Sequence, residues 1–343
     1  MLYILIIILL ICIIYGISII FRKKQSIESF TSQEPIDIVY TYVDGNDPEF
    51  ISTRKYISKK YYDPNINTND SNILGRFNDR DELKYSLRSV DYYLNFYRNI
   101  YIVTNGTLPK WLNINHPRIK TINHSDIPVL KDYLPTYNSH AIEANLHRIP
   151  ELSEKFLCFN DDMLISKKVN ISDFIKDGKI IIHSDNALSY NGKNNTTNSG
   201  FDNAWTNSNR YLDYKYKPEK RYIYQHVPLL INKNIVNNLW NELPNELVQT
   251  TKSKFRSIYD HIIFQALHTF TLYYNNLFSY PEYKISDYLS SNDIHRFILS
   301  NFNKSKYKFI CINDEGDKDI EKTDLAYKNL LEEMYPVKSQ FEI

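Results

Sequence analysis

The sequence has 343 residues, 43% of them hydrophobic and 24% charged, a composition typical of a globular protein with a sizeable core. Its 41 Lys and Arg residues against 40 Asp and Glu residues give a formal net charge of +1, so no global basic field is present to hold nucleic acid. The composition excludes a disordered tail and a multi-span membrane protein, and it predicts no nucleic-acid partner.

The N-terminal segment is strongly apolar. Residues 2–21 carry no charge, and 20 helical residues span about 30 Å, the hydrocarbon thickness of a bilayer. A basic cluster follows at 22–24, and no cleavage site typical of a signal peptide is evident. We therefore expect a single-pass membrane anchor with its basic flank over 1–24, a linker over 25–35 and one folded domain over 36–343. The positive-inside tendency favours a cytoplasmic domain, with the Golgi or ER lumen left open.

Strands that alternate with helices predict the fold. Apolar and β-branched runs predict buried strands at 36–45, 99–106, 156–159, 179–183 and 308–312. Helices are expected at 79–97, 138–149, 258–273 and 319–334. The polar segments 51–75 and 186–217 are interpreted as surface loops, the first with a short helix. This alternation predicts an α/β fold with a largely parallel, Rossmann-like sheet flanked by helices, which binds ligands at the carboxyl ends of its strands.

Three acidic turns follow three of the predicted strands. They are Asp44-Gly45-Asn46-Asp47, Asn160-Asp161-Asp162 and Asn313-Asp314-Glu315. Carboxylates that face a common crevice suit an oxygen-ligated divalent cation, although Asp, Asn and Gly also form ordinary turns after strands. Three such turns in one chain favour a cation site. The sequence has no Gly-rich phosphate loop of either common pattern, so a P-loop or a dinucleotide site has no support.

Histidine and arginine residues are the other candidates for chemistry. His140 and His147 are seven residues apart, on nearly one face of a predicted helix. His226 precedes a Val-Pro pair that favours extended backbone, and its side chain titrates near neutrality, as a general base requires. Arg148 and Arg256 are candidate phosphate ligands. Each of these residues could instead have a purely structural role.

The cysteines do not form a recognisable pattern. Cys158 and Cys311 lie in apolar runs that predict buried strands. The sequence has neither a disulfide framework nor a CxxC zinc motif, which favours a reducing compartment.

Four blocks of the sequence resemble the Stealth family, whose members include the catalytic subunit of the lysosomal-enzyme GlcNAc-1-phosphotransferase and bacterial capsule polymerases. The blocks are IDIVYTYVDGNDPEF at 36–50, a long block from Arg76 to Met163, the pair QHVPLLINKNIV and KFRSIYD at 225–236 and 254–260, and YKFICINDEGDKD through EEMYPVKSQFEI at 307–343. They follow the family order and span nearly all of the chain after residue 35. Tyr42 stands where the family usually has Trp, and Cys158 replaces a more usual aromatic or aliphatic residue.

The resemblance implies a GT-A-like fold and a transfer reaction. A sugar-1-phosphate, such as GlcNAc-1-phosphate, would pass from a UDP-sugar to a hydroxyl of a sugar or glycan, releasing UMP. The implied catalytic residues are His226 as general base, Arg256 and Asp162. The implied ligands of Mg²⁺ or Mn²⁺ are Asp161, Asp162, Asn313 and Asp314. The residues expected to bind substrate are Asp44, Gly45, Arg88, Asn138, His140, Glu143, Arg148 and Asp260.

Two other functions stay open. A metal-dependent glycosyltransferase, in which the hydroxyl attacks the anomeric carbon, needs the same residue types but releases UDP. An inactive membrane-anchored glycan-binding protein would show no turnover. A homodimer is also left open.

Overall fold

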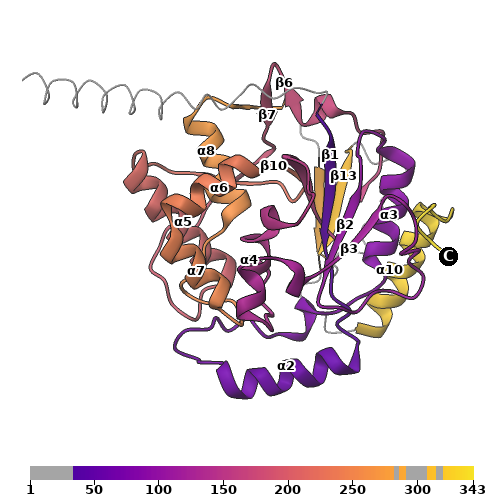
Figure 1. Ribbon diagram of the computed structural model, residues 1–343, viewed down its shortest axis with the longest axis horizontal. Coiled ribbons are helices and arrows are strands. Elements are labelled where there is room, and N and C mark those ends of the chain that lie inside the picture. Colours follow the sequence, from indigo (N-terminus) through magenta and orange to yellow (C-terminus); the bar gives the residue numbers. More distant parts are fainter. Residues whose placement is uncertain (1–33, 282–285, 291–306, 314–319) are drawn as a thin grey trace, which may run out of the picture. The chain divides into compact units, whose positions relative to one another are not determined.

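The computed structural model describes residues 34–281, 286–290, 307–313 and 320–343 (Figure 1). The expected membrane anchor at 2–21 lies outside these residues. Across the ranges just given, no helix is long and apolar enough to cross a bilayer. The expectation of an N-terminal transmembrane helix and of a single-pass membrane location is therefore not supported and is corrected here, together with the cytoplasmic placement that depended on it.

The central sheet has five strands in the order β10-β4-β1-β2-β3. Their bounds are Ile36–Thr41 for β1, Ile100–Thr104 for β2, Ile119–Asn123 for β3, Lys155–Asn160 for β4 and Leu229–Asn232 for β10. β1 pairs in parallel with β2 and β4, β2 pairs in parallel with β3, and only β10 runs antiparallel. The largely parallel α/β sheet is thus present as predicted. The carboxyl ends of β4, β1, β2 and β3 form one continuous edge.

Helices cover both faces of this sheet, which explains why its central strands are continuous apolar runs. Figure 1 shows α4 (Ser139–Glu143), α5 (Gly200–Lys215), α6 (Lys233–Glu242) and α7 (Pro244–Lys252) on one side. On the other side lie α3 (Glu82–Tyr93) and α10 (Ile320–Met334). The strand residues between them are buried, among them Ile38, Val39, Leu157 and Phe159.

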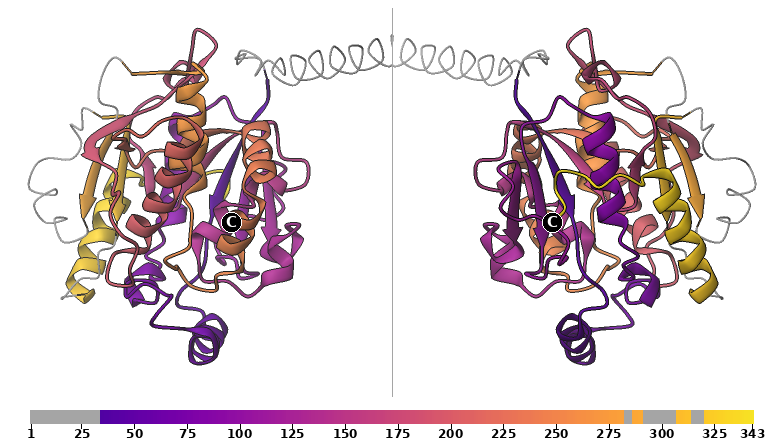
Figure 2. Two further views of the ribbon diagram at one scale, coloured as in Figure 1. Left: turned by 90° about the vertical axis from the view of Figure 1, so that its left-hand side faces the viewer. Right: turned by 90° about the vertical axis from the view of Figure 1, so that its right-hand side faces the viewer.

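A second sheet extends the first. It has the order β12-β13-β5, with β5 at Met163–Ile165, β12 at Ser286–Ser290 and β13 at Phe309–Asn313. Tyr85, Leu164, Ile310, Tyr327 and Leu331 belong to one buried apolar cluster that joins α3, β5, β13 and α10. Figure 2 shows α10, in yellow, beside the orange strands of this second sheet. Because β5 follows β4 after a turn of two residues, Asp161 and Asp162, the two sheets meet at this acidic turn.

Shorter elements complete the described part of the chain. They are α2 (Pro48–Tyr61), β6 (Ile175–Lys176), β7 (Lys179–Ile181), β8 (Ser184–Leu188), β9 (Tyr222–Tyr224), a π-helical turn (Ile263–His268), α8 (Thr269–Tyr274), β11 (Phe278–Ser279) and several 3₁₀ turns, one of them at Leu146–Arg148. The helix predicted at 138–149 is thus a short helix followed by a 3₁₀ turn. The helix predicted at 258–273 begins later, at Ile263, in π form.

Segment 186–217 differs from the predicted surface loop, because it contains the 16-residue helix α5. Ser199 caps this helix: its side chain accepts a hydrogen bond of 3.0 Å from the backbone N–H of Asp202. Trp205 and Leu212, on the inner face of this helix, are buried. In segment 51–75 the predicted helix is α2, which begins at Pro48 and runs for 14 residues.

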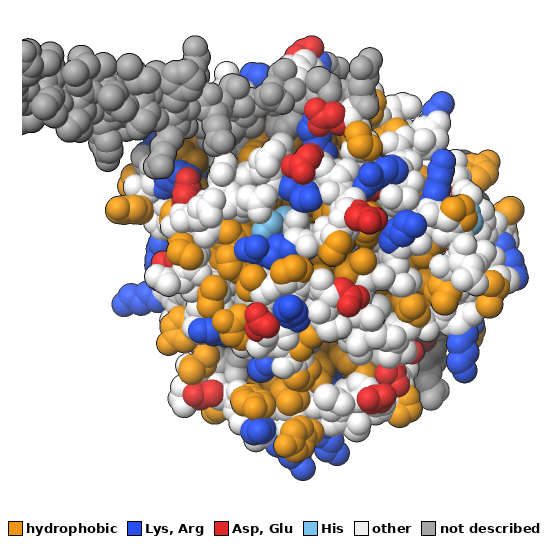
Figure 3. Space-filling view, in the orientation of Figure 1, with side chains coloured by type: hydrophobic (Ala, Val, Ile, Leu, Met, Phe, Trp, Pro, Cys, Tyr) orange, Lys and Arg blue, Asp and Glu red, His pale blue; other side chains and the backbone are white. Residues whose placement is uncertain are grey.

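The surface mixes charges of both signs. On the face drawn in Figure 3, Lys and Arg side chains are interspersed with Asp and Glu. A small anionic ligand would therefore be held by a local group of residues rather than by the field of the whole molecule.

Candidate active site

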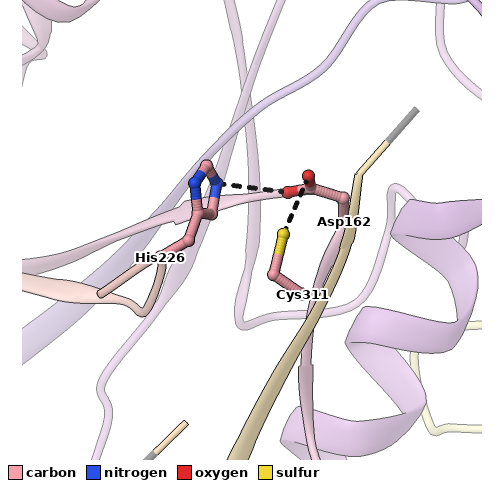
Figure 4. A group of neighbouring side chains, drawn as sticks. All are labelled: Asp162, His226 and Cys311. Atoms are coloured by element: carbon pink, nitrogen blue, oxygen red, sulfur yellow. Dashed lines mark hydrogen bonds and ion pairs between the residues drawn. The ribbon is translucent and has the colours of Figure 1, made fainter. Parts of the chain in front are cut away.

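Three side chains from distant segments meet at the junction of the two sheets (Figure 4). They are Asp162, in the turn between β4 and β5, His226, in the loop before β10, and Cys311, in β13. β10 runs antiparallel to β4 and so brings the loop with His226 to the carboxyl end of β4. β13 pairs with β5 and so places Cys311 beside Asp162. Strand pairing therefore builds this group, which we call the Asp–His–Cys cluster.

The distances within the Asp–His–Cys cluster are short. The Sγ of Cys311 lies 3.2 Å from Oδ2 of Asp162, and Nε2 of His226 lies 3.7 Å from the other carboxylate oxygen, Oδ1. Asn160 holds the imidazole, with its Nδ2 at 3.1 Å from Nε2 of His226. Oδ1 of Asp162 is buried and has no hydrogen-bond partner among the described residues. A buried carboxylate oxygen without a donor is suited to bind a cation.

The environment of His226 combines opposing effects on its pKa. Burial lowers the pKa, but the charge and hydrogen bonding of Asp162 and the charge of Glu143 raise it by more, so the net shift is upward. The side chain keeps 26% of its surface exposed, so a substrate can reach it. His226 is therefore accessible, oriented by Asn160 and more readily protonated than an ordinary histidine.

Further carboxylates surround the acidic turn. Burial, with the charges of Asp162 and Asp79, raises the pKa of Asp161 to about 8. Burial and the charge of Asp161 raise the pKa of Glu82 well above its ordinary value. Burial also raises the pKa of Asp79, which accepts a hydrogen bond of 2.6 Å from Oη of Tyr42. This excess of negative charge, partly suppressed by protonation, is what a divalent cation would offset.

The oxygen donors present fit Mg²⁺ or Mn²⁺ in part. Asp161 and Asp162 are adjacent carboxylates at a strand end, and Asn313 ends β13 two residues after Cys311. Asp314 lies outside the described residues. Three of the four expected oxygen ligands, Asp161, Asp162 and Asn313, thus lie within the described residues. Their arrangement around an ion stays a prediction.

A second group of side chains is organised by Asp260, which is fully buried. Oδ2 of Asp260 accepts a hydrogen bond of 2.8 Å from Nδ2 of Asn138, and Oδ1 accepts one of 2.7 Å from Oγ of Ser257. Nδ1 of His140 lies 3.1 Å from Oδ2. Burial and the charge of Arg256 lower the pKa of His140, so its imidazole is neutral and donates Nδ1–H to the carboxylate. Nε2 of His140 is then the acceptor.

Arg256 lies beside this group. Its Nη2 donates a hydrogen bond of 2.7 Å to Oγ of Ser139, the first residue of α4. Burial and the neighbouring charge of Arg76 lower the pKa of Arg256 to about 10, so it remains a cation. Glu143, at the other end of α4, has its pKa raised to about 7 by burial, and the charges of Arg256 and His226 both act to lower it. The charges of the two groups thus both act on Glu143.

Two of the expected substrate-binding residues have other partners. Arg88 pairs with both carboxylate oxygens of Glu342, at 2.8 and 2.9 Å, and donates to the backbone oxygen of Tyr335 at 2.6 Å. These bonds attach α3 to the C-terminal segment. The guanidinium carbon of Arg148 lies 4.4 Å from the ring centroid of Trp240 in α6. The structure does not bring either arginine into the groups around Asp162 and Asp260.

Asp44 and Gly45 follow β1 along the same sheet edge. Oδ1 of Asp44 accepts a hydrogen bond of 2.9 Å from the backbone N–H of Asn46, which closes the turn. A Cβ on Gly45 would lie 1.2 Å from the backbone oxygen of Phe77, so no other residue fits at this close approach without movement. The contact with a nucleotide expected of these two residues stays a prediction.

A cleft of about 810 Å³ lies along the carboxyl ends of β1, β2 and β3. Its lining includes Asp47 after β1, Thr107 after β2, His124 after β3, and Pro135 and Tyr137. Clefts at the carboxyl ends of parallel strands are the usual ligand sites of α/β proteins.

Sequence reasoning missed several residues of the site. Cys311 resembled an ordinary core residue, since it lies within an apolar strand. Asp79 and Glu82 lie in the acidic run NDRDE at the start of the second Stealth-like block, which was an available signal. Asp70 and Arg76, an ion pair that borders Arg256, gave no comparable signal.

Solved structures with partial similarity are glycosyltransferases. The galactosyltransferase LgtC, in complex with donor and acceptor sugar analogs, shares 11% identity at a TM-score of 0.39, over 88% of this chain and 95% of that one. The bifunctional glycosyltransferase WbbM shares 10% identity at a TM-score of 0.43, over 89% of this chain and 50% of that one. Mouse xyloside xylosyltransferase 1 shares 11% identity at a TM-score of 0.40, over 83% of this chain and 99% of that one.

Sequence relatives are phosphotransferases by name. An exopolysaccharide phosphotransferase of Streptomyces coelicolor is 31% identical over 90% of this chain and 51% of its own length. The exopolysaccharide phosphotransferase CpsY of Mycobacterium leprae is 31% identical over 90% of this chain and 57% of its own length. The capsular polysaccharide phosphotransferase SacB of Neisseria meningitidis serogroup A is 30% identical over 94% and 60%. The chain thus spans about half of the length of these curated relatives.

Two family models match the chain. Stealth protein CR1, conserved region 1, matches residues 34–62, and Stealth protein CR2, conserved region 2, matches residues 76–182. These regions include β1, the acidic turn after β4 and the α4 residues of the site, and they coincide with the first two Stealth-like blocks. The chain thus matches conserved regions 1 and 2 of the Stealth family.

Proposed function

We propose that this chain transfers a sugar-1-phosphate from a nucleotide sugar to a hydroxyl of a sugar or glycan, with release of a nucleoside monophosphate. The observation that carries the proposal is the placement of His226 beside Asp162, and the charges of His226 and Arg256 both act on Glu143. A base, an acidic cation site and a buried cation are the groups that phosphoryl transfer needs. The names of the relatives, which are polysaccharide phosphotransferases, favour the same reaction.

The donor is assigned to the cleft at the ends of β1, β2 and β3. Its volume of about 810 Å³ lies within the range of small-molecule sites and is sufficient for a UDP-sugar such as UDP-GlcNAc. Because β1 lies between β2 and β4, a nucleotide in this cleft would direct its diphosphate past Asp44 and Gly45 towards the acidic turn after β4. The scissile phosphorus would then lie near Asp162 and His226.

A divalent cation is part of the proposal. Asp161, Asp162 and Asn313 would hold Mg²⁺ or Mn²⁺, because Oδ1 of Asp162 has no donor and the surrounding carboxylates repel one another. Such an ion supplies positive charge for the phosphate oxygens of the donor.

The protein's own residues would perform the remaining steps. Nε2 of His226 accepts the proton of the acceptor hydroxyl while that oxygen attacks the phosphorus attached to the sugar. A bond forms between the acceptor oxygen and phosphorus, and the bond to the leaving nucleoside monophosphate breaks in line with it. Arg256 offsets the charge on the phosphoryl oxygens. Asp260 acts as a positioning residue, because it fixes Asn138 and His140 on the crevice wall.

The test is to incubate the purified chain with a panel of UDP-sugars, Mg²⁺ and oligosaccharide acceptors, and to identify the released nucleotide by chromatography. We expect UMP, together with a phosphodiester signal on the acceptor in ³¹P NMR. Chelation by EDTA should stop the reaction, and a chelator-insensitive enzyme would remove the cation from the proposal. Release of UDP would instead indicate glycosyl transfer. The absence of turnover with every donor in the panel would indicate a glycan-binding protein.

A further inference from the structure

The Asp–His–Cys cluster contains donors that the proposed reaction does not require. Mg²⁺ and Mn²⁺ prefer oxygen ligands, whereas Asp162, His226 and Cys311 together offer oxygen, nitrogen and sulfur. One ligand atom from each lies within 4.8 Å of the other two (Figure 4). A thiol and an imidazole that converge on one carboxylate form a donor set typical of Zn²⁺.

The separations agree with a tetrahedral ion. Bonds of about 2.3 Å to sulfur and about 2.0–2.2 Å to nitrogen and oxygen place neighbouring ligand atoms about 3.4–3.6 Å apart. Sγ of Cys311 lies 3.2 Å from Oδ2 of Asp162, and Nε2 of His226 lies 3.7 Å from the other carboxylate oxygen, Oδ1. Each separation is close to the tetrahedral value, and an ion held by all three side chains requires the carboxylate to turn one of its oxygens towards both partners.

The ligands are also held in place before any ion binds. Cys311 is fully buried in β13, which pairs with β5 immediately after Asp162. His226 is held by Asn160 at 3.1 Å. Oδ1 of Asp162 lies 3.7 Å from Nε2 of His226 and has no hydrogen-bond partner among the described residues, so it can accept an ion, which at Nε2 would take the place of the hydrogen bond from Asn160.

We propose that Asp162, His226 and Cys311 form a Zn²⁺ site, and that its occupation inhibits the enzyme. Binding releases the Cys311 thiol proton to solvent, so that the thiolate is the ligand. The inhibitory part rests on the proposed function, because Zn²⁺ would occupy Nε2 of His226, the base, and the carboxylate of Asp162, the ligand of the activating ion. The fourth position would be filled by water.

Binding is tested without substrate, on the full chain. Co²⁺ is used as a spectroscopic probe, and Zn²⁺ affinity is measured by competition with a chromophoric chelator. We expect a thiolate-to-Co²⁺ charge-transfer band in the wild-type protein, its loss in Cys311→Ser, and a Zn²⁺ affinity lower by about 100-fold or more in that variant. Cys158→Ser, which changes the other buried strand cysteine described, should keep both the band and the affinity. Equal Zn²⁺ affinity in wild type and Cys311→Ser would overturn the site.

Inhibition is tested separately through UMP release at saturating Mg²⁺, with each variant compared with its own zinc-free rate. The wild type should lose activity at a Zn²⁺ concentration about 100-fold or more below that needed for Cys311→Ser. Equal sensitivity of the two, or stimulation by Zn²⁺, would overturn the inhibitory role. The two proposals fail independently, since the absence of a cobalt band leaves UMP release unaffected, and the absence of UMP release leaves the band unaffected.

Discussion

Arg256 occupies the space that a side chain on Gly200 would need. A Cβ on Gly200 would lie 2.7 Å from Cδ and 2.8 Å from Cβ of Arg256. Gly200 is the first residue of α5, and its backbone N–H donates to Oδ1 of Asp70 at 3.0 Å. The start of α5 therefore sets the position of the arginine that the proposed reaction uses.

Gly200→Ala should lower activity without unfolding the protein. The added methyl group displaces Arg256 from its bond to Ser139, and a misplacement of about 1 Å in a charged group costs between about 10- and 100-fold in rate. Alanine suits a helix better than glycine, so the helix itself should not weaken. UMP release and thermal unfolding measure the two effects. Tyr214→Ala, on an 89% exposed side chain of the same helix, is the control, and an unchanged rate in Gly200→Ala would contradict the argument.

Gly45→Ala should destabilise the fold. The new Cβ would overlap the backbone oxygen of Phe77, and two backbone segments cannot separate as easily as a side chain can rotate. We expect a loss of about 1–3 kcal/mol or more in the free energy of unfolding, measured in urea. Gly192→Ala is the matched control, because its Cβ would meet only the ring of Tyr190, which is 38% exposed and can move. Equal stability of the two variants would show that the close approach at Gly45 is not required.

Asp260→Asn should weaken both the fold and the reaction. The carboxylate accepts hydrogen bonds from Asn138, His140 and Ser257, and an amide group would turn an N–H towards at least one of these donors. A buried donor left without an acceptor costs about 1–3 kcal/mol. Urea unfolding should show this loss, and UMP release should fall because His140 and Asn138 lose their fixed orientation. Asp132→Asn, on the exposed surface, should change neither, and wild-type stability in Asp260→Asn would refute the role.

His226→Ala and Asp162→Ala should each abolish UMP release while the protein stays folded. The first removes the proposed base, and the second removes both the partner of that base and a ligand of the cation. Because both side chains are partly exposed, at 26% and 15%, their removal should leave the melting temperature nearly unchanged. His116→Ala is the control, because it changes a partly exposed histidine whose ring contacts Gln340 and the backbone N–H of Arg118, away from the Asp–His–Cys cluster. Activity that persists in either variant would remove the corresponding role.

The sequence predicts those strands that are buried along nearly all of their length. The strands β1, β2, β4 and β13 were predicted because a strand buried on both faces is a continuous apolar run. Helix α5 was not predicted, since its few buried apolar residues, such as Trp205 and Leu212, are separated by polar residues, among them Thr, Asn and Ser, in a segment whose composition resembles a loop. Local composition cannot reveal a helix whose stability comes mainly from tertiary packing.

The site shows the same division. His226, Asp162, Asp260 and Arg256 were chosen through residue type and family resemblance. The structure places His226 beside Asp162, and the charges of Arg256 and Asp260 both act on His140. The position of Cys311 depends on the antiparallel pairing of β13 with β5, a long-range register that a single sequence does not specify. Glu342, the partner of Arg88, lies 254 residues away along the chain, so the ion pair that holds Arg88 against the C-terminal segment was equally hidden.

Acid should destabilise the protein through its buried histidines. Burial lowers the pKa of His268 to about 3, and its Nε2 accepts a hydrogen bond of 3.0 Å from the backbone N–H of Asn232. The pKa of an unfolded histidine is about 6.5, so the unfolded chain takes up a proton first. The stabilisation is therefore complete above pH ~6.5 and is lost as the pH falls towards about 3. The carboxyl groups of Asp161 and Glu143, with pKa values raised to about 8 and about 7, act in the opposite sense.

A single substitution separates the effect of His268 on stability from that of the carboxyl groups. His268→Gln keeps an acceptor for Asn232 but cannot be protonated, so the difference in unfolding free energy between wild type and variant isolates the histidine. Between pH ~6 and pH ~4, this difference should change in favour of the variant by up to about 1.4 kcal/mol for each pH unit. Urea unfolding at a series of pH values measures it, with His116→Ala as the control at a histidine that is not buried. Parallel pH profiles for wild type and His268→Gln would show that His268 is not the neutral, buried acceptor described above.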